Sequence, residues 1–194
     1  MKLESETIFQ QYLVKDKLEL YLREVSAANR KFNLFSRNFG QKDLKALIAE
    51  SLLPLEMGWI DINAGPILDI GSGWGIPSLP LLMTGRAFNI TLVERSQKKA
   101  DFLLLLLHRL GLKADVINNE LSELSNSKKY SLVLMRRVRI DEKIILSMKR
   151  LTEKSASLVY FGKDLPIDSF KSQQIIDYTT DGGDSRRVIK AGII

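Results

Sequence analysis

Three glycines at alternate positions, Gly71, Gly73 and Gly75, are the feature of this 194-residue chain that most directly indicates chemistry. They follow Asp69 near the end of the apolar run Ile67–Ile70, and a segment of helical character comes next. Glycine lets the backbone turn sharply and approach a ligand closely, and a turn leading into a helix presents free N–H groups to that ligand. The pattern therefore predicts a cofactor site in this turn.

Two cofactor classes compete for the glycine turn. A dinucleotide-binding turn has the pattern G-x-G-x-x-G, in which the helix N-terminus holds a pyrophosphate. Here Ile76 occupies the position of the third glycine, and the bulky Trp74 lies inside the turn. The observed G-x-G-x-G after an acidic residue is used by S-adenosylmethionine-dependent methyltransferases, whose cofactor has no phosphate. We therefore favour S-adenosylmethionine, and a nicotinamide-dependent oxidoreductase is the less favoured alternative.

A second acidic residue completes the predicted cofactor site. Glu94 directly follows the apolar segment Ile90–Val93. A carboxylate at the end of the second strand can accept hydrogen bonds from both hydroxyls of an adenosine ribose. The order of strand, glycine turn, helix, strand and acid thus indicates a cofactor that contains adenosine.

Alternating strands and helices must position these residues. Short apolar segments of strand type are separated by helical segments, which is typical of βαβ units and a mainly parallel sheet with ligands at the carboxyl ends of its strands. We expect an α/β fold with a doubly wound, mainly parallel, seven-stranded sheet. The predicted strands are 67–70, 90–93, 115–117, 132–135, 157–161, 175–179 and 187–193, and the predicted helices between them are 77–83, 98–110 and 141–151.

The N-terminal third reads as helical. We predict one long helix over residues 5–28, a loop over 29–40, and a second amphipathic helix over 44–52 that stops before Pro54. No Gly/Ser linker follows, so residues 1–63 are expected to form a helical cap packed on the main domain, residues 64–194. The leucine run 103–107 has no polar face, and we expect it to be buried nearly all round between the sheet and the cap, with His108 at the surface.

Composition excludes several kinds of protein. The chain has no cysteine, so disulfides, thiolate zinc sites and cysteine nucleophiles are ruled out, and it has a single histidine. Its longest apolar run, 102–107, is far shorter than the ~20 residues that a bilayer requires. The first residues lack the apolar core of a signal peptide. We expect a cytoplasmic protein without a membrane partner.

Positive charge is concentrated in one segment. Residues 128–163 contain ten basic and three acidic side chains, against a net charge of +6 for the whole chain. Such a localised field attracts polyanions. Charge alone does not separate RNA from DNA or an anionic membrane, or from a solvated helix face rich in lysine.

From about Asn29 to the C-terminus, the sequence resembles the small-subunit (16S) ribosomal RNA guanine-N7 methyltransferases, also called glucose-inhibited division protein B. The resemblance is carried by short segments along the chain. They are Asn33-Leu34, Glu50-Ser51, Asp69 to Pro77, Leu92-Val93-Glu94, Lys98-Lys99 with Phe102-Leu103, Arg136, and Arg186-Arg187.

The resemblance implies S-adenosylmethionine as cofactor and ribosomal RNA, or the small ribosomal subunit, as partner, with no metal and a monomeric protein. The expected cofactor-binding residues are Asp69, Gly71, Ser72, Gly73, Gly75, Ile76, Glu94, Arg95, Leu121, Ser122 and Arg136. The expected catalytic residues are Asn33, Arg136 and Lys163, and the expected nucleic-acid-binding residues are Arg137, Arg139, Arg186 and Arg187.

The implied chemistry needs little from the protein's acids and bases. Guanine N7 carries an in-plane lone pair that is not used in Watson–Crick pairing, so it attacks a methyl group without losing a proton. Positioning and electrostatics then supply most of the acceleration. Arg136 and Lys163 are candidates to place positive charge near the guanine O6.

The sequence also departs from the family pattern. Leu47 and Glu120 stand where the family usually has histidine and arginine, and a Lys-Gly pair appears reversed as Gly162-Lys163. Small residues are usual at Trp74 and Ser78. Two further alternatives therefore stay open: a methyltransferase acting on another RNA or a small molecule, and a catalytically silent protein that binds nucleic acid or ribosomes.

Overall fold

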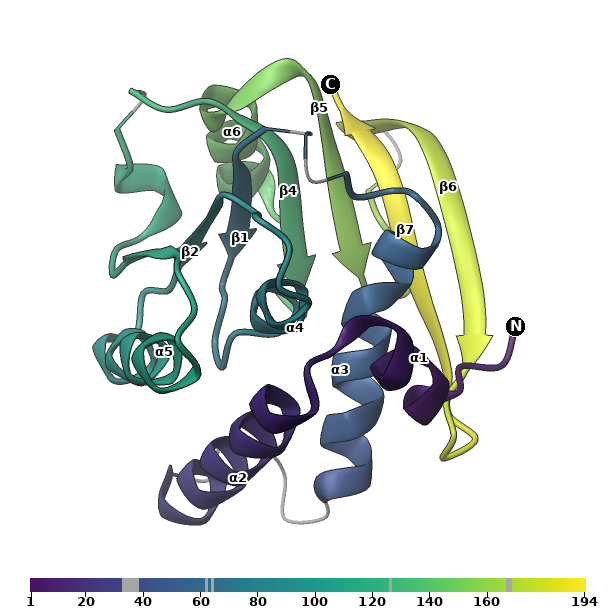
Figure 1. The fold of residues 1–194 in the computed structure, drawn as a ribbon. Helices are drawn as coiled ribbons and strands as arrows, with labels where there is room; N and C mark the ends of the chain where they lie inside the picture. The colour runs from purple at the N-terminus through teal and green to yellow at the C-terminus, as the bar shows by residue number, and fades with distance from the viewer. Residues whose placement is uncertain (33–38, 62, 64, 126, 167–168) are drawn as a thin grey trace.

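The computed structural model describes residues 1–194 except 33–38, 62, 64, 126 and 167–168. Helices and strands alternate after an N-terminal helical region (Figure 1). In chain order the elements are α1 (Ser5–Tyr12), α2 (Lys15–Phe32), α3 (Gln41–Glu56), β1 (Ile67–Ile70), α4 (Ser78–Met83), β2 (Ile90–Val93), α5 (Gln97–Leu110), β3 (Asp115–Ile117), the 3-10 helix η1 (Leu121–Glu123), β4 (Tyr130–Arg136), α6 (Glu142–Leu151), β5 (Thr152–Phe161), β6 (Phe170–Thr179) and β7 (Ser185–Ile193).

The strands form one seven-stranded sheet in the order β3-β2-β1-β4-β5-β7-β6. Strands β1 to β5 are parallel, and β7 runs antiparallel to both of its neighbours, β5 and β6. The chain winds outward from β1 to β3 and then crosses back to β4, so the strand order reverses between β1 and β4. Ligands bind at the carboxyl ends of the strands beside such a switch point. The predicted α/β class and the doubly wound, seven-stranded sheet are confirmed.

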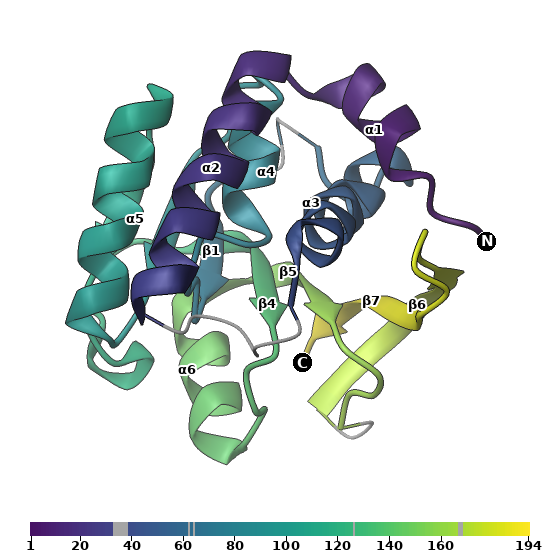
Figure 2. The same ribbon diagram turned by 90° about the horizontal axis from the view of Figure 1, so that it is seen from below.

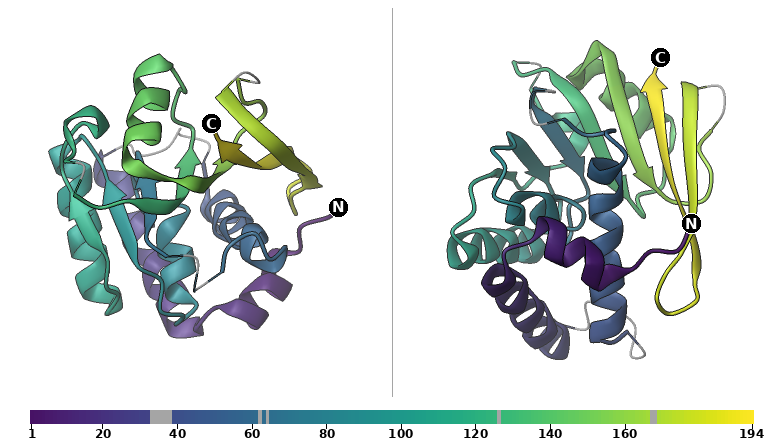
Figure 3. Two further views of the ribbon diagram at one scale, coloured as in Figure 1. Left: turned by 90° about the horizontal axis from the view of Figure 1, so that it is seen from above. Right: turned by 45° about the vertical axis from the view of Figure 1, so that its right-hand side comes forward.

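Helices cover the two faces of the sheet unequally. Helices α1 to α5 lie on one side and α6 on the other, as Figures 2 and 3 show from below and from above. Side chains alternate along each buried strand, so Ile67 joins the core under α1 to α5, whereas Leu68 joins the core under α6. Residues of all three N-terminal helices belong to the first of these cores.

Local signals account well for the elements around the site. The predicted bounds of β1, β2 and β3 are those observed. Helix α5 ends at Leu110, and Gly111 is its C-cap residue. Gly111 has a φ of +60°, a left-handed conformation that residues with a side chain adopt only with strain. Helix α6 begins after Asp141, whose side chain accepts a hydrogen bond of 2.9 Å from the backbone N–H of Ile144.

The N-terminal region differs from the prediction. The single helix expected over residues 5–28 is two helices, because Leu13 and Val14 leave the helical conformation; α1 then packs against α3, while α2 packs against α3 and α5. Helix α2 also runs on to Phe32, beyond the predicted end. Helix α3 extends through Pro54 to Glu56: the proline lacks one N–H donor, but the helical hydrogen bonding continues, since the N–H of Met57 donates to the carbonyl of Leu53 at 2.9 Å.

The leucine run on α5 is also exposed more than expected. Leu103, Leu106 and Leu107 are buried, but Leu104 and Leu105 are 53% and 42% exposed. An α-helix has 3.6 residues per turn, so five consecutive leucines point in all directions around its axis. The sheet and α2 cover one side of α5, and the opposite side faces solvent. His108 is exposed, as predicted.

Candidate functional site

The glycine turn begins at the carboxyl end of β1 and is fastened to β2. The backbone N–H groups of Gly71 and Ser72 donate to the carbonyl of Val93 at 2.9 and 3.1 Å. Gly71 has a φ of +70°, and a Cβ there would lie 2.5 Å from Cγ2 of Val138. Backbone conformation and lack of space therefore both require glycine at this position.

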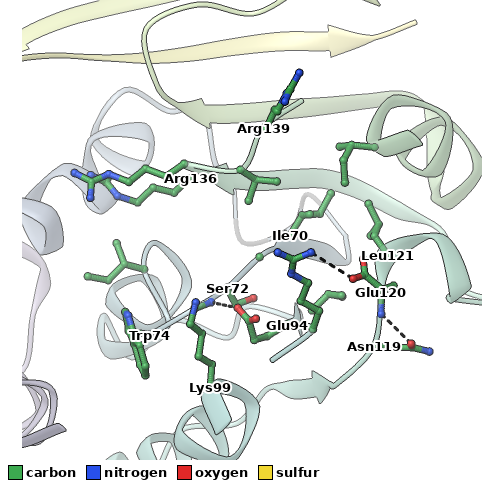
Figure 4. Close-up of a pocket in the computed structure, with 18 of the residues that line it drawn as sticks. Ile70, Ser72, Trp74, Glu94, Lys99, Asn119, Glu120, Leu121, Arg136 and Arg139 are labelled. Atoms are coloured by element: carbon green, nitrogen blue, oxygen red, sulfur yellow. Dashed lines mark hydrogen bonds and ion pairs between the residues drawn. The ribbon is translucent and has the colours of Figure 1, made fainter. Parts of the chain in front are cut away.

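Glu94 ties the turn to the end of β2. Its Oε2 accepts a hydrogen bond of 2.9 Å from the N–H of Gly73, and its Oε1 accepts one of 2.9 Å from the N–H of Ser96. The residue is buried and lines the pocket described below (Figure 4). Each carboxylate oxygen has two lone pairs, so both retain capacity for the hydroxyl groups of a ligand.

Asp69 lies beneath the turn, fully buried. Ser78 donates a hydrogen bond of 2.5 Å to its Oδ2, whereas its Oδ1 has no hydrogen-bond partner among the described residues. Burial raises the pKa of Asp69 from 3.8 to about 7; the Ser78 hydrogen bond opposes the rise, and the negative charge of Glu94 adds to it. Asp69 does not line the pocket, so its carboxyl group supports the turn from below.

A cavity of about 680 Å³ opens at the carboxyl ends of β1, β2 and β4. Its volume is in the range of small-molecule and cofactor sites. Trp74 lines this cavity and leaves it open. The predicted site residues that line it are Gly71, Ser72, Gly73, Ile76, Glu94, Arg95, Leu121, Arg136, Arg137 and Arg139.

One end of the pocket is formed by the loop after β3. Asn119, Glu120 and Leu121 line it, and Arg95 pairs with Glu120 at 3.5 Å (Figure 4). Behind this loop the guanidinium of Arg150, on α6, donates to the carbonyls of three loop residues at 2.5 to 3.3 Å: Leu124, Ser122 and Leu121. Sequence reasoning missed Arg150, because nothing distinguishes it from the other basic residues of its segment.

Arg136 marks the opposite end of the pocket (Figure 4). Its guanidinium is nearly buried and forms an ion pair with Glu50 of α3, and its Cζ lies 5.8 Å from the ring centroid of Phe161. Burial lowers the pKa of Arg136, and the negative charge of Glu50 counteracts that effect. In the sequence, Glu50 was identified only as part of the family resemblance. Its contact with Arg136, 86 positions further along the chain, was not predicted.

Trp74 lies on the same side of the pocket as Lys99 (Figure 4). Its backbone carbonyl accepts a hydrogen bond of 3.0 Å from the hydroxyl of the buried Tyr21. Its ring packs edge-on against the ring of Phe102, with 5.4 Å between the ring centroids. The ammonium of Lys99 lies 5.6 Å from the ring centroid, within the range of a cation–π contact. These contacts hold Trp74 at the wall of the pocket.

The other predicted residues lie away from the pocket lining. Gly75 and Ser122 adjoin lining residues, while Lys163 is exposed and contributes its carbonyl to a hydrogen bond of 3.1 Å from Arg187. Arg187 also pairs with Asp177 at 2.6 Å, and Arg186 lies 3.2 Å from Asp184. Asn33 falls outside the described residues. The roles predicted for these residues stay predictions.

The described part of the chain has neither a membrane-spanning helix nor a metal-binding cluster. None of its helices is both long and apolar enough to cross a membrane. None of its groups of three or more His, Asp or Glu residues is arranged to hold a metal ion.

Comparison with known structures concerns the fold. Magnesium protoporphyrin IX methyltransferase from Synechocystis PCC 6803, solved with bound SAH, superposes with a TM-score of 0.62 at 16% identity, covering 93% of this chain and 100% of that one. The Thermus thermophilus 16S rRNA N2 G1207 methyltransferase, solved with AdoMet and guanosine, gives a TM-score of 0.59 at 14% identity, covering 82% and 45%. The chain therefore has the fold of these methyltransferases.

Sequence comparison identifies the family. The curated protein named ribosomal RNA small subunit methyltransferase G from Borrelia duttonii is 38% identical over 125 residues, and the match spans 62% of this chain and 57% of that relative. The protein of the same name from Borrelia garinii subsp. bavariensis is 32% identical over 160 residues, and the match spans 79% of this chain and 75% of that relative. The family profile described as rRNA small subunit methyltransferase G matches residues 14–179. The chain belongs to the rRNA small subunit methyltransferase G family.

Proposed function

We propose that this protein is an S-adenosylmethionine-dependent methyltransferase. The observation that supports this most strongly is the glycine turn. Glu94, at the end of β2, accepts a hydrogen bond from the N–H of Gly73, and there is no room for a side chain at Gly71. The residues present fit the cofactor: the turn offers a close backbone surface, Glu94 retains acceptor capacity for ribose hydroxyls, and Leu121 offers an apolar surface for a base. Bound there, the cofactor would supply a methyl group on a positively charged sulfur.

We infer further that the methyl acceptor is N7 of a guanine in small-subunit ribosomal RNA. Family membership supports this substrate. Arg137, Arg139 and Lys143 also line the mouth of the pocket, and Arg137 and Arg139 are exposed, where they can contact phosphates. We propose that the protein acts in the cytoplasm, where ribosomal subunits are assembled, and that it acts as a monomer.

The residues at the pocket suit a reaction without a general base. Guanine N7 has no proton to lose, and the described residues lining the pocket include no histidine. Of the three carboxylates that line the pocket, Glu94 accepts two backbone hydrogen bonds, Asp141 accepts one from the N–H of Ile144, and Glu120 pairs with Arg95, so all three are engaged. Arg136 holds positive charge at one end of the pocket, where it can stabilise the electron-rich edge of a guanine. The protein's task is then to orient two reactants and exclude water.

Two measurements test the proposal. Calorimetry with S-adenosylhomocysteine and with NAD separates the cofactor classes, and we expect micromolar binding of the former only. Binding of NAD without binding of S-adenosylhomocysteine would overturn the methyltransferase proposal.

The second measurement concerns the substrate. Purified protein, labelled cofactor and either naked small-subunit RNA or assembled subunits should yield one methylated guanine, and Arg136→Ala should reduce the signal severely. Because Leu47 and Trp74 give the pocket a more apolar wall than the family pattern, methylation of a different RNA or a small molecule is the outcome that would replace the ribosomal substrate.

A further inference from the structure

The carboxylate of Glu50 occupies an unusual position for an acidic side chain. Glu50 lies within α3 and is 2% exposed. Its Oε2 forms the ion pair with Arg136 at the end of β4. Arg136 lines the pocket, whereas Glu50 does not. The carboxylate therefore contacts the pocket through Arg136 and not directly.

A second guanidinium approaches the same carboxylate oxygen. Nη1 of Arg186, on β7, lies 3.6 Å from Oε2 of Glu50, and this Nη1 is buried without a hydrogen-bond partner among the described residues. One carboxylate thus serves two guanidinium groups from β4 and β7, the strands on either side of β5. Without its negative charge, Arg136 and Arg186 would face each other as two poorly solvated cations.

We propose that Glu50 is a positioning residue, which fixes the guanidinium of Arg136 at the edge of the pocket and screens it from Arg186. The role in methyl transfer rests on the proposed function, but the effect on the position of Arg136 does not. An arginine side chain has several rotatable bonds, and a buried carboxylate that accepts from one of its N–H groups selects one orientation. Removing one partner of a buried pair leaves the other uncompensated, so Arg136 should turn toward solvent when Glu50 loses its charge.

Three variants separate charge from shape. Glu50→Gln keeps the size of the side chain and removes the charge, whereas Glu50→Asp keeps the charge and shortens the side chain. Glu24→Gln is the matched control, because Glu24 pairs with Arg109 between α2 and α5, away from the pocket. We expect Glu50→Gln to lower kcat/KM by about tenfold or more, Glu50→Asp to lower it less, and Glu24→Gln to leave it unchanged. Equal or better activity of the Gln variant than of the Asp variant would overturn the proposal.

A double-mutant cycle tests whether Glu50 acts through Arg136. In an Arg136→Ala background, Glu50→Gln should change the affinity for S-adenosylhomocysteine and the residual rate by less than about twofold, because its partner is already gone. A purely structural role predicts the same additional loss in both backgrounds, and that result would refute the proposal. If Glu50→Gln does not fold, the cycle is run with Glu50→Asp in the same Arg136→Ala background, with the same criterion.

A crystal structure of Glu50→Gln gives a readout that does not depend on activity. We expect the guanidinium of Arg136 to leave its position beside α3. Arg136 in its original place would overturn the positioning role, whatever reaction the protein catalyses. Conversely, if Arg136 is displaced in Glu50→Gln and the wild-type protein does not bind S-adenosylhomocysteine, the positioning role is supported and the proposed function is contradicted.

Discussion

Replacing Asp69 with asparagine should stabilise the protein by an amount that grows as the pH rises from 5 to 8. Burial raises the pKa of Asp69 to about 7 in the folded protein, whereas the unfolded chain has the ordinary value of 3.8. Between these two values the folded state holds a proton that the unfolded state has released, so the free energy of unfolding falls as the pH rises. The stabilisation is complete below pH 3.8 and is lost as the pH passes through about 7.

The magnitude follows from the difference between the two pKa values. A difference of about three pH units corresponds to about 4 kcal/mol, at ~1.36 kcal/mol per unit, and about 3 kcal/mol of this should be lost between pH 5 and pH 8. An asparagine avoids that loss because it carries no charge, and its amide oxygen can still accept the hydrogen bond from Ser78. Against the wild type, Asp69→Asn should therefore gain about 3 kcal/mol over the same range.

Urea unfolding followed by circular dichroism at pH 5, 6, 7 and 8 measures this difference. Asp115→Asn, at a side chain that is 71% exposed, controls for the change in net charge. A stability difference between wild type and Asp69→Asn that stays constant from pH 5 to pH 8 would show that Asp69 ionises normally. Burial would then not raise the pKa of Asp69.

Two further predictions concern the walls of the pocket. Gly71→Ala should weaken binding of S-adenosylhomocysteine more than about tenfold in calorimetry, because the new Cβ meets Val138. Gly111→Ala is the control: it carries the same positive-φ penalty of ~1–2 kcal/mol without a clash, and its binding should be unchanged. Arg150→Gln should also weaken this binding and speed hydrogen exchange at the loop after β3, because three carbonyls lose their donor, whereas Lys149→Gln should alter neither measurement. Wild-type affinity in Gly71→Ala or in Arg150→Gln would contradict the corresponding role.

The sequence predicted the elements around the cofactor site better than the N-terminal region. Strands β1 and β2 were predicted residue for residue, because apolar runs bounded by turn residues are local signals. The break at Leu13 was not predicted, since the apolar spacing continues across it and only the packing of α1 on α3 requires the chain to turn. The exposure of Leu104 likewise depends on which side of α5 its neighbours cover.

For the candidate site, the order of residues along the chain was enough to indicate the glycine turn and the carboxylate of Glu94. Both lie at the ends of adjacent parallel strands, and their chemistry follows from that placement. Three features depended on the tertiary structure: the ion pair between Glu50 and Arg136, the hold of Arg150 on the loop after β3, and the burial that raises the pKa of Asp69. The physical reason is range. Backbone preferences act within a few residues, whereas contacts across a sheet and the solvation of a charge depend on segments that only folding brings together.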